Sequence, residues 1–287
     1  MKPQDLKTKI FLDGGDPKET KAIMGKLGFL DGQTTNPTLI SKNPEAQKRL
    51  ADGKPFTEQE IWRFYKDVVS EISSIIPEGS VSIEVYADDT TSSETMIKQA
   101  HELFTWIPNA QIKFPINEAG LTAAEDAIKN SMRVNMTLCF TQQQAAAVYA
   151  ATKGAKKGDV FLSPFVGRLD DIGIDGMSLV SDCVKLYEPG DGHVEVLSAS
   201  VRSYEHFMAS LAAKADIITS PAKILEEWVE KGLPIPDENY MYDAGDLKAI
   251  PLETTDLNKS WNEYDLKHDL TNKGIERFAS DWNALIK

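Results

Sequence analysis

The most reactive side chain that the sequence places inside an apolar strand is a lysine. Lys113 lies in the segment Gln111–Pro115, where Ile112 and Phe114 flank it and predict a buried strand. A lysine at such a place often reaches water through its aliphatic stem. The alternative is a nucleophile that forms an imine with a carbonyl substrate, because desolvation favours the neutral amine that must attack. Taken alone, the segment leaves both interpretations open.

Two carboxylates in other strand-like segments could move protons beside this lysine. Asp13 ends Lys9–Asp13, and Glu84 lies in Ser80–Tyr86. A single carboxylate at a strand end is more often a helix cap or an ion-pair partner. Two carboxylates that converge on a lysine would instead supply a general acid and a general base. Either residue could take either role, since spacing along the chain does not measure their separation.

Hydroxyl, amide and guanidinium groups end most of the remaining strand-like segments. The polar residues expected near these ends are Thr34, Asn36, Asn135, Thr137, Ser163, Arg168, Ser198, Ser200 and Arg202. Strand alternation predicts that Asn135 and Thr137 share one face. It also predicts a shared face for Ser198, Ser200 and Arg202. The arginines, with a serine and backbone N–H groups, could form an anion cradle.

Eight short strand-like runs alternate with longer amphipathic stretches along the chain. The runs are Lys9–Asp13, Phe29–Thr35, Ser80–Tyr86, Gln111–Pro115, Val134–Phe140, Asp159–Phe165, Val194–Val201 and Asp216–Thr219. Strands that alternate with helices predict right-handed βαβ units and a parallel sheet. Eight units predict an α/β fold with a single (β/α)8 TIM barrel, whose active site lies at the carboxyl ends of the strands. An open doubly wound sheet is the rival, but no G-x-G-x-x-G motif follows the first strand.

Two segments depart from this repeat. Ser41–Phe56 is predicted to be a polar loop, because it contains two prolines and a glycine. Pro234–Gly274 is acidic and rich in turn residues, and Ile275–Ile286 carries an apolar stripe at helical spacing. Residues 234–287 hold too few apolar residues for a core of their own. We therefore expect residues 1–287 to form one domain, with 234–287 as a C-terminal helical extension packed on the barrel.

Composition excludes several classes of function. The 287 residues carry 44 acidic and 31 basic side chains, a net charge of −13, which argues against binding to nucleic acid. Apolar runs are too short for a membrane span, and the N-terminal residues lack the apolar run of a secretory signal. A cytoplasmic protein is expected. The two cysteines and four histidines show no metal-binding spacing, so no metal is predicted.

Five segments match, in order and with comparable spacing, the motifs of one enzyme family. They are Asp31–Ile40 (DGQTTNPTLI), Ile112–Pro115 followed by Glu118–Gly120, Val134–Leu138 (VNMTL), Ser163–Arg168 (SPFVGR) and Ala199–Arg202 (ASVR). Together they resemble the transaldolase family, from Asp13 to about Pro221. Pro234–Gly274 matches no motif of that family.

This resemblance implies a Schiff base on Lys113, with Asp13 as the acid/base for the substrate hydroxyl. Glu84 and Thr137 would hold a water that carries protons. Further residues implied to bind substrate are Thr34, Asn36, Asn135 and Ser163 around the dihydroxyacetone unit, and Arg168, Ser200 and Arg202 around the sugar phosphate. Phe165 is also expected to bind substrate. No cofactor is implied, because the protonated imine is itself the electron sink.

The resemblance implies transfer of a dihydroxyacetone unit in the pentose phosphate pathway. The donor would be sedoheptulose 7-phosphate or fructose 6-phosphate, and the acceptor glyceraldehyde 3-phosphate or erythrose 4-phosphate. Fructose 6-phosphate aldolases, which release free dihydroxyacetone, are similar but typically carry Gln at Glu84 and Tyr at Phe165. Larger transaldolases often carry Trp where Ile116-Asn117 stands here. A non-catalytic sugar-phosphate-binding barrel is a further alternative, and a homodimer is common in the family.

Overall fold

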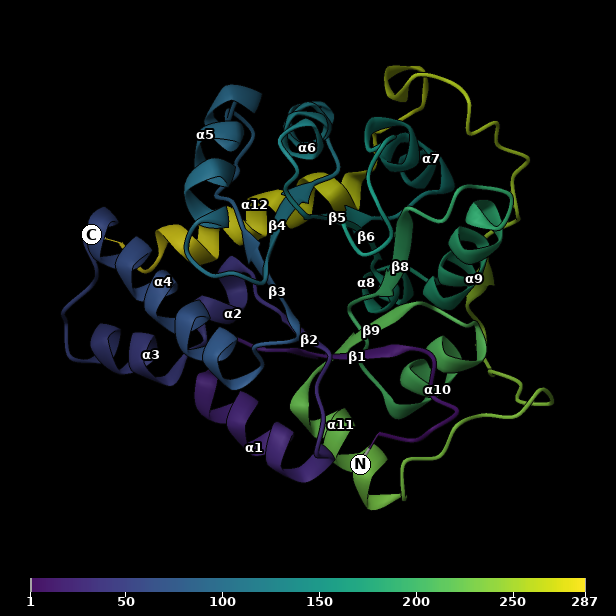
Figure 1. Ribbon diagram of the computed structural model, residues 1–287, viewed down its shortest axis with the longest axis horizontal. Helices are drawn as coiled ribbons and strands as arrows, with labels where there is room; N and C mark the ends of the chain where they lie inside the picture. The colour runs from purple at the N-terminus through teal and green to yellow at the C-terminus, as the bar shows by residue number, and fades with distance from the viewer. Residues whose placement is uncertain (1, 287) are drawn as a thin grey trace.

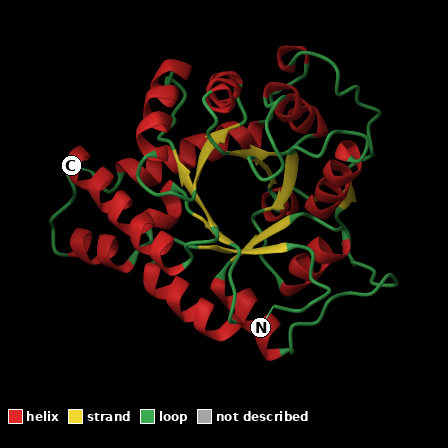
Figure 2. Ribbon diagram, viewed as in Figure 1, coloured by secondary structure: helices red, strands yellow, loops and turns green. Residues whose placement is uncertain are grey.

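Eight parallel strands close into a barrel in the computed structural model, which describes residues 2–286 (Figures 1 and 2). Around the barrel they run β1 Lys9–Asp13, β2 Gly32–Thr34, β3 Ser80–Glu84, β4 Ala110–Pro115, β5 Val134–Cys139, β6 Val160–Pro164, β8 Val194–Ser198 and β9 Ile217–Ser220. Two short strands, β7 Ile174–Asp175 and β10 Lys248–Ala249, pair outside the barrel. The predicted (β/α)8 barrel is confirmed.

Helices surround the barrel on the outside (Figure 2). They are α1 Pro17–Leu27, α2 Pro37–Ser41, α3 Pro44–Ala51, α4 Glu58–Ile75, α5 Ser93–Phe104, α6 Glu118–Lys129, α7 Gln142–Ala151, α8 Val166–Asp170, α9 Gly176–Tyr187, α10 Tyr204–Ala212, α11 Ala222–Glu230 and α12 Asp269–Asn283, with a 3-10 turn at Trp261–Glu263. Local sequence sets their starts; Thr57, for example, forms a capping box with Glu60 ahead of α4. Within residues 2–286, no helix combines the length and apolarity that a membrane crossing requires.

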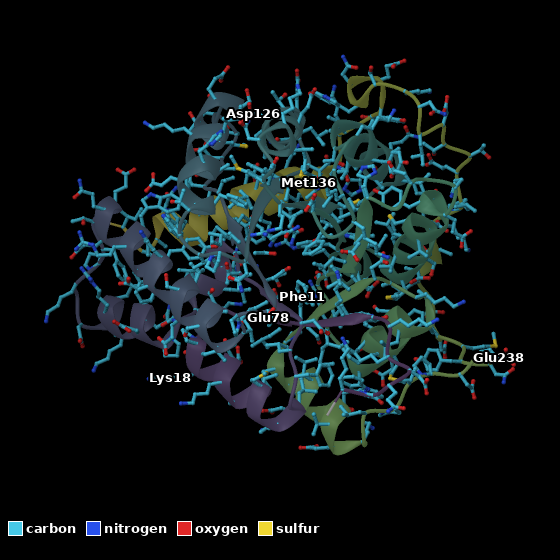
Figure 3. The ribbon with its side chains drawn as sticks, in the orientation of Figure 1. Phe11, Lys18, Glu78, Asp126, Met136 and Glu238 are labelled. Atoms are coloured by element: carbon cyan, nitrogen blue, oxygen red, sulfur yellow. The ribbon has the colours of Figure 1, made fainter. Side chains whose placement is uncertain are left out.

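Side chains fill the barrel interior, so it is a core and not a channel. Phe11 on β1 meets Phe161 on β6 edge to face, with ring centroids 5.8 Å apart, and Figure 3 shows Phe11 near the centre of the molecule. At the amino ends of the strands, Lys9 pairs with the buried Glu195 at 2.9 Å. Polar and charged groups at the carboxyl ends are therefore separated from this pair by an aromatic layer.

The predicted loop at Ser41–Phe56 is wrong in its first part. Asn43 caps helix α3 by accepting a hydrogen bond from the Glu45 N–H at 2.9 Å, and Pro44 occupies the first helical position. Proline is well suited to that position, because its missing N–H would have no partner there. Pro44, one of the two prolines on which the loop prediction rested, is thus at a helix start.

The C-terminal helix also begins earlier than predicted. Helix α12 starts at Asp269, six residues before the expected Ile275, after His268 caps it by accepting from the Leu270 N–H at 3.2 Å. The preceding segment, residues 234–268, runs along the outside of the barrel past α10, α9 and α7 (Figure 1). Helix α12 then contacts α2 and β5 at the carboxyl end of the barrel.

Candidate active site

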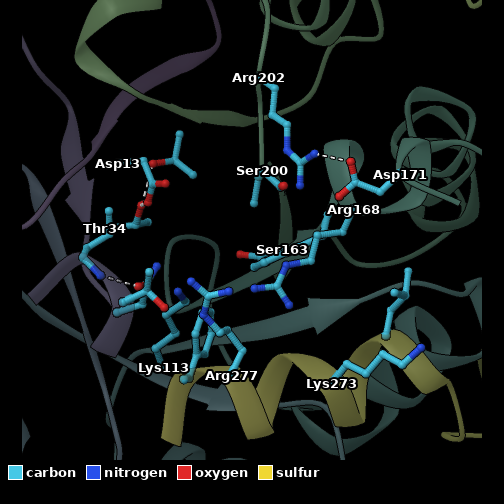
Figure 4. Close-up of a pocket in the computed structure, with 18 of the residues that line it drawn as sticks. Asp13, Thr34, Lys113, Ser163, Arg168, Asp171, Ser200, Arg202, Lys273 and Arg277 are labelled. Carbon is cyan, nitrogen blue, oxygen red and sulfur yellow. Dashed lines mark hydrogen bonds and ion pairs between the residues drawn. The ribbon is translucent and has the colours of Figure 1, made fainter. Parts of the chain in front are cut away.

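A cavity of about 680 Å³ opens at the carboxyl ends of the barrel strands (Figure 4). Of the predicted site residues, those that line it are Asp13, Thr34, Asn36, Lys113, Ser163, Phe165, Arg168, Ser200 and Arg202. Glu84, Asn135 and Thr137 are buried and lie outside this lining. A wider groove of about 1230 Å³ lies outside the barrel by α4 and α5 and contains none of the predicted residues.

Lys113 and Glu84 form a buried ion pair. Their strands pair so that the two residues stand opposite each other, and Nζ lies 3.1 Å from Glu84 Oε2. Both side chains are 4% exposed. Nζ also donates a long hydrogen bond of 3.4 Å to the Thr35 carbonyl oxygen. Burial raises the pKa of Glu84, and the positive charge of Lys113 opposes that rise.

Asp13 lies across the cavity on β1. Its Oδ1 accepts a hydrogen bond of 2.7 Å from Thr34 Oγ1, which is also 2.6 Å from Thr219 Oγ1. Some surface of Asp13 faces the cavity, but protein surrounds its carboxyl group, and this burial raises its pKa. The Thr34 hydrogen bond and the charges of Lys113 and Lys42 oppose the rise. Asp13 is therefore placed to accept or release a proton inside the cavity.

Amide and hydroxyl groups lie beneath the cavity on the central strands. Asn135 accepts from Ser163 Oγ at 2.7 Å and donates to Ser82 Oγ at 3.0 Å. Thr137 Oγ1 is one of several buried side-chain atoms of the described residues that have no hydrogen-bond partner, and Glu84 Oε2 has only its ion pair with Lys113. Buried polar atoms are usually satisfied, so these two have capacity to hold a small polar molecule such as water.

Guanidinium groups gather at the opposite side of the cavity from Asp13 and Thr34 (Figure 4). Arg168 lies between the rings of Phe165 and Phe278, each centroid 5.4 Å from its guanidinium carbon. Burial lowers the pKa of Arg168, and the charges of Arg202 and Arg277 lower it further. Such a cluster of positive charges in a partly buried site favours a bound anion.

Two segments of the chain, around Gly167 and around Arg202, pack closely at this cluster. Arg202 pairs with Asp171 and lies directly over Gly167, where an added Cβ would come within 2.5 Å of the Arg202 side chain. Ser200 takes a positive φ of 56°, which turns the chain from β8 towards the cavity. Only a glycine fits at position 167 without a shift of Arg202.

The predicted face shared by Ser198, Ser200 and Arg202 is wrong. Ser198 points outward, with Oγ 2.7 Å from Ser210 Oγ on α10. Strand β8 ends at Ser198, so the strict alternation of strand side chains stops before the left-handed Ser200. Ser200 and Arg202 reach the cavity from a loop, and Ser198 belongs to the interface between strand and helix.

Comparison with known proteins agrees with the predicted family. The family model described as transaldolase/fructose-6-phosphate aldolase matches residues 10–287, nearly the whole chain. The chain belongs to the transaldolase/fructose-6-phosphate aldolase family. It is 34% identical to a probable transaldolase of Dehalococcoides mccartyi, over 97% of this chain and all of the relative. A probable transaldolase 2 of Listeria monocytogenes is 33% identical, over 96% of each chain.

The match to this transaldolase family includes the C-terminal extension, which the sequence motifs did not reach. Helix α12 supplies one wall of the cavity, through Leu270, Lys273, Glu276, Arg277 and Phe278. The apolar stripe of this helix was predicted, but its polar residues Lys273, Glu276 and Arg277 were not predicted to line the site. The helical spacing of Lys273 and Arg277, four residues apart on one face, was the available signal.

Two further lining residues were also missed. Lys42 follows α2 in the segment that was predicted to be a loop, and its charge acts on Asp13. Thr219 lies on the last barrel strand, two residues before Pro221, and hydrogen-bonds Thr34. Its position as a polar residue near a strand end was the same signal that identified the residues on the other strands.

Proposed function

We propose that this protein is a transaldolase that moves a dihydroxyacetone unit between sugar phosphates through an imine on Lys113. The single observation that carries the proposal is the buried pair of Lys113 and Glu84, whose lysine lines the same cavity as Asp13. A buried amine beside a carboxylate of raised pKa can give up its proton and attack a ketone. Family membership supports the same chemistry.

The first stage is condensation of the ketone with the lysine. Glu84 takes a proton from the Lys113 ammonium, and the neutral amine adds to the ketone carbon. Loss of water from the resulting carbinolamine needs a proton on the departing hydroxyl, which Glu84 returns through a water held near Thr137. Thr137 Oγ1, which has no hydrogen-bond partner among the described residues, supports this placement. The product is a protonated imine.

The second stage breaks and remakes a carbon–carbon bond. Asp13 removes the proton of the C4 hydroxyl, the C3–C4 bond breaks, and its electron pair moves into the protonated imine to give an enamine. The aldose phosphate leaves and an acceptor aldehyde replaces it. The enamine then attacks the acceptor carbonyl, Asp13 returns the proton, and water releases the new ketose phosphate from the lysine.

The remaining predicted residues would hold the substrate during both stages. The hydroxyls of the dihydroxyacetone unit would be bound by Thr34, Asn36, Asn135 and Ser163. Asn36 also caps α2 by accepting a hydrogen bond from the Leu39 N–H at 2.8 Å. The phosphate would bind among the guanidinium groups at the other side of the cavity. Its binders would be Arg168, Ser200 and Arg202, with Phe165 beneath Arg168.

Borohydride trapping tests the imine directly. The protein incubated with fructose 6-phosphate and borohydride should gain one adduct, which peptide mass spectrometry should place on Lys113. Lys113→Met should abolish the adduct, whereas the control Lys273→Met, which changes another lysine of the same cavity, should retain it. An adduct on a different lysine would refute the assignment.

The family description covers both transferases and aldolases, so a second assay is needed. A transaldolase should form product from fructose 6-phosphate only when an acceptor such as erythrose 4-phosphate is present. An aldolase should release free dihydroxyacetone without it. Glu84 and Phe165 favour the transferase. A Lys113→Ala variant that turns over like the unchanged protein would instead indicate a non-catalytic binder. The cytoplasmic location and the homodimer stay predictions.

A further inference from the structure

His206 is buried beside the cationic side of the cavity, yet it contributes nothing to the cavity lining. It lies on α10, four residues after Arg202. None of the catalytic steps uses it, and it lies outside the five motif segments of the sequence. Its two ring nitrogens nevertheless contact both chain segments that carry the guanidinium groups of the proposed phosphate site.

Each ring nitrogen has a different partner. Nδ1 lies 3.4 Å from the backbone nitrogen of Arg202 and accepts its N–H. Nε2 lies 3.0 Å from Asp170 Oδ2, at the last residue of the short helix α8. Asp170 is fixed in turn, because its Oδ1 accepts from the Gly176 N–H at 3.0 Å. Arg168 lies on that same helix.

These contacts require a neutral imidazole with its proton on Nε2. Burial lowers the pKa of His206, and Arg202 lowers it further, while Asp170, Glu205 and Asp175 oppose the fall. These groups come from α8, from α10 itself and from β7, and the ring of Tyr242 packs on the remaining side at 6.0 Å between centroids. The neutral ring can donate to Asp170 and accept from Arg202 at once.

We propose that His206 is a positioning residue that fixes the spacing of Arg168 and Arg202, and thereby sets the affinity of the cavity for phosphorylated substrates. The inference rests on the proposed function for the identity of the ligand. His206 touches no substrate in this proposal. It acts by joining the backbone of Arg202 to the helix that bears Arg168.

The need for such a link follows from the charges. Arg168, Arg202 and Arg277 lie close enough for each of the other two to lower the pKa of Arg168. Like charges repel, so an empty site tends to spread, and ligand binding must then restore the geometry at a cost in affinity. Arg168 itself has no ion pair within residues 2–286 and is held by aromatic rings alone. A rigid imidazole between the two segments reduces that cost.

Three substitutions separate the two contacts. His206→Asn keeps an acceptor near the Arg202 N–H but loses the contact with Asp170. His206→Gln keeps a donor towards Asp170 but loses the hydrogen bond from Arg202. His206→Phe removes both contacts. We expect the KM for fructose 6-phosphate to rise about tenfold in the Phe variant and less in the Asn and Gln variants. The kcat at saturation should stay within about threefold of the unchanged value.

A merely structural role would not produce this pattern. With unphosphorylated glyceraldehyde as the acceptor, the KM for glyceraldehyde should be unchanged in all three variants, because this acceptor has no phosphate group to place in the phosphate site. His101→Phe, which alters an exposed histidine on α5, should leave every parameter unchanged. Equal rises of KM for phosphorylated and unphosphorylated substrates, together with a lower Tm, would overturn the proposal.

Binding of inorganic phosphate provides a measurement that needs no turnover. In calorimetry, the unchanged protein should bind phosphate, and His206→Phe should bind it about tenfold more weakly. Unaltered phosphate binding in the Gln and Phe variants, or no binding by the unchanged protein, would overturn the inference. If phosphate binding weakens as expected but borohydride traps no adduct on Lys113, the positioning role stands and the proposed function fails.

Discussion

At the scale of single residues, the same residue types act differently according to where the barrel places them. Glu195 and Glu84 are both buried glutamates that pair with a lysine, but Glu195 lies at the amino ends of the strands, whereas the lysine that pairs with Glu84 lines the cavity. The sequence identified Lys113 because a lysine between two apolar residues is unusual in a buried strand. It did not establish the partner, because the separation of Glu84 and Lys113 depends on strand register and not on spacing along the chain.

Glu84→Gln tests the proton transfer proposed for this pair. Glutamine fills the same space but cannot take the lysine proton, so imine formation should slow, and kcat should fall by about 10² to 10³. The KM for phosphorylated substrate should change little, because Glu84 lies outside the cavity lining. Steady-state kinetics measures both values, and a kcat within threefold of the unchanged protein would contradict the proton-transfer role.

Asp13→Asn should separate stability from activity. Burial raises the pKa of Asp13 above its ordinary value of 3.8, so its protonation favours the folded state. That contribution is complete below pH 3.8 and is lost as pH rises through the folded-state pKa. The charged form of Asp13 is therefore the one that destabilises the fold.

The Asn variant should accordingly show a higher Tm than the unchanged protein at pH 7, with little activity. Its advantage should shrink as the pH is lowered towards 4, because the unchanged protein then regains its protonated Asp13. Calorimetry of both proteins over that range measures the difference. A variant that is less stable at pH 7 would show that the Thr34 hydrogen bond outweighs burial.

At the scale of elements, the cavity depends on a helix that lies outside the barrel repeat. The ring of Phe278 on α12 makes cation–π contacts with two basic side chains. Its centroid lies 5.8 Å from Lys113 Nζ and 5.4 Å from the guanidinium carbon of Arg168. Thr38 on α2 hydrogen-bonds Asp281, which also pairs with Arg277 at 2.9 Å. Helix α2 thus anchors α12 at the mouth, and both helices carry cavity residues.

Thr38→Val removes this anchor while keeping the side-chain shape. Loss of one hydrogen bond of this kind costs about 1 kcal/mol, so α12 should exchange its amide hydrogens faster. The KM for fructose 6-phosphate should rise several-fold, because Asp281, the ion-pair partner of Arg277, is then no longer held by Thr38. Hydrogen exchange and kinetics measure these effects, and Ser41→Ala on the same helix is the control. Unchanged exchange in α12 would contradict the anchoring role.

The elements that sequence predicted well are those with strong periodicity. The strands predicted at Lys9–Asp13 and Gln111–Pro115 agree with the structure to within a residue. The short helices α2 and α3 were missed, because five and eight residues are too few to show a period. The position of α12 across the mouth could not be predicted, since it depends on tertiary contacts with α2 and β5.

At the scale of the whole molecule, stability and chemistry occupy opposite ends of the barrel. The layer of Phe11 and Phe161 separates the Lys9–Glu195 pair from the cavity. Contacts of α12 with the barrel also lead us to propose that residues 1–287 form one domain. The net charge of −13 coexists with a cavity whose lining carries six Lys and Arg side chains against three Asp and Glu side chains. Net charge therefore argued against nucleic acid as a partner but did not predict the local anion site.

Lys9→Met tests this separation. Glu195 is 3% exposed and would lose its partner, which should cost about 2 kcal/mol, less than for a fully buried pair because Lys9 is 39% exposed. Urea unfolding measures the loss, and the KM for fructose 6-phosphate should stay unchanged. A second change, Glu195→Met, should restore part of the stability. A large effect on KM would show that the two ends of the barrel are coupled.

The position of α12 in the chain has a consequence for biosynthesis. All eight barrel strands precede Asp269, so a nascent chain can pair β9 with β1 and close its sheet before α12 has left the ribosome. Lys113 and Glu84 would then already face each other, but the wall formed by Arg277 and Phe278 would be missing. The surroundings of the reactive amine can therefore form during translation, before α12 completes the pocket.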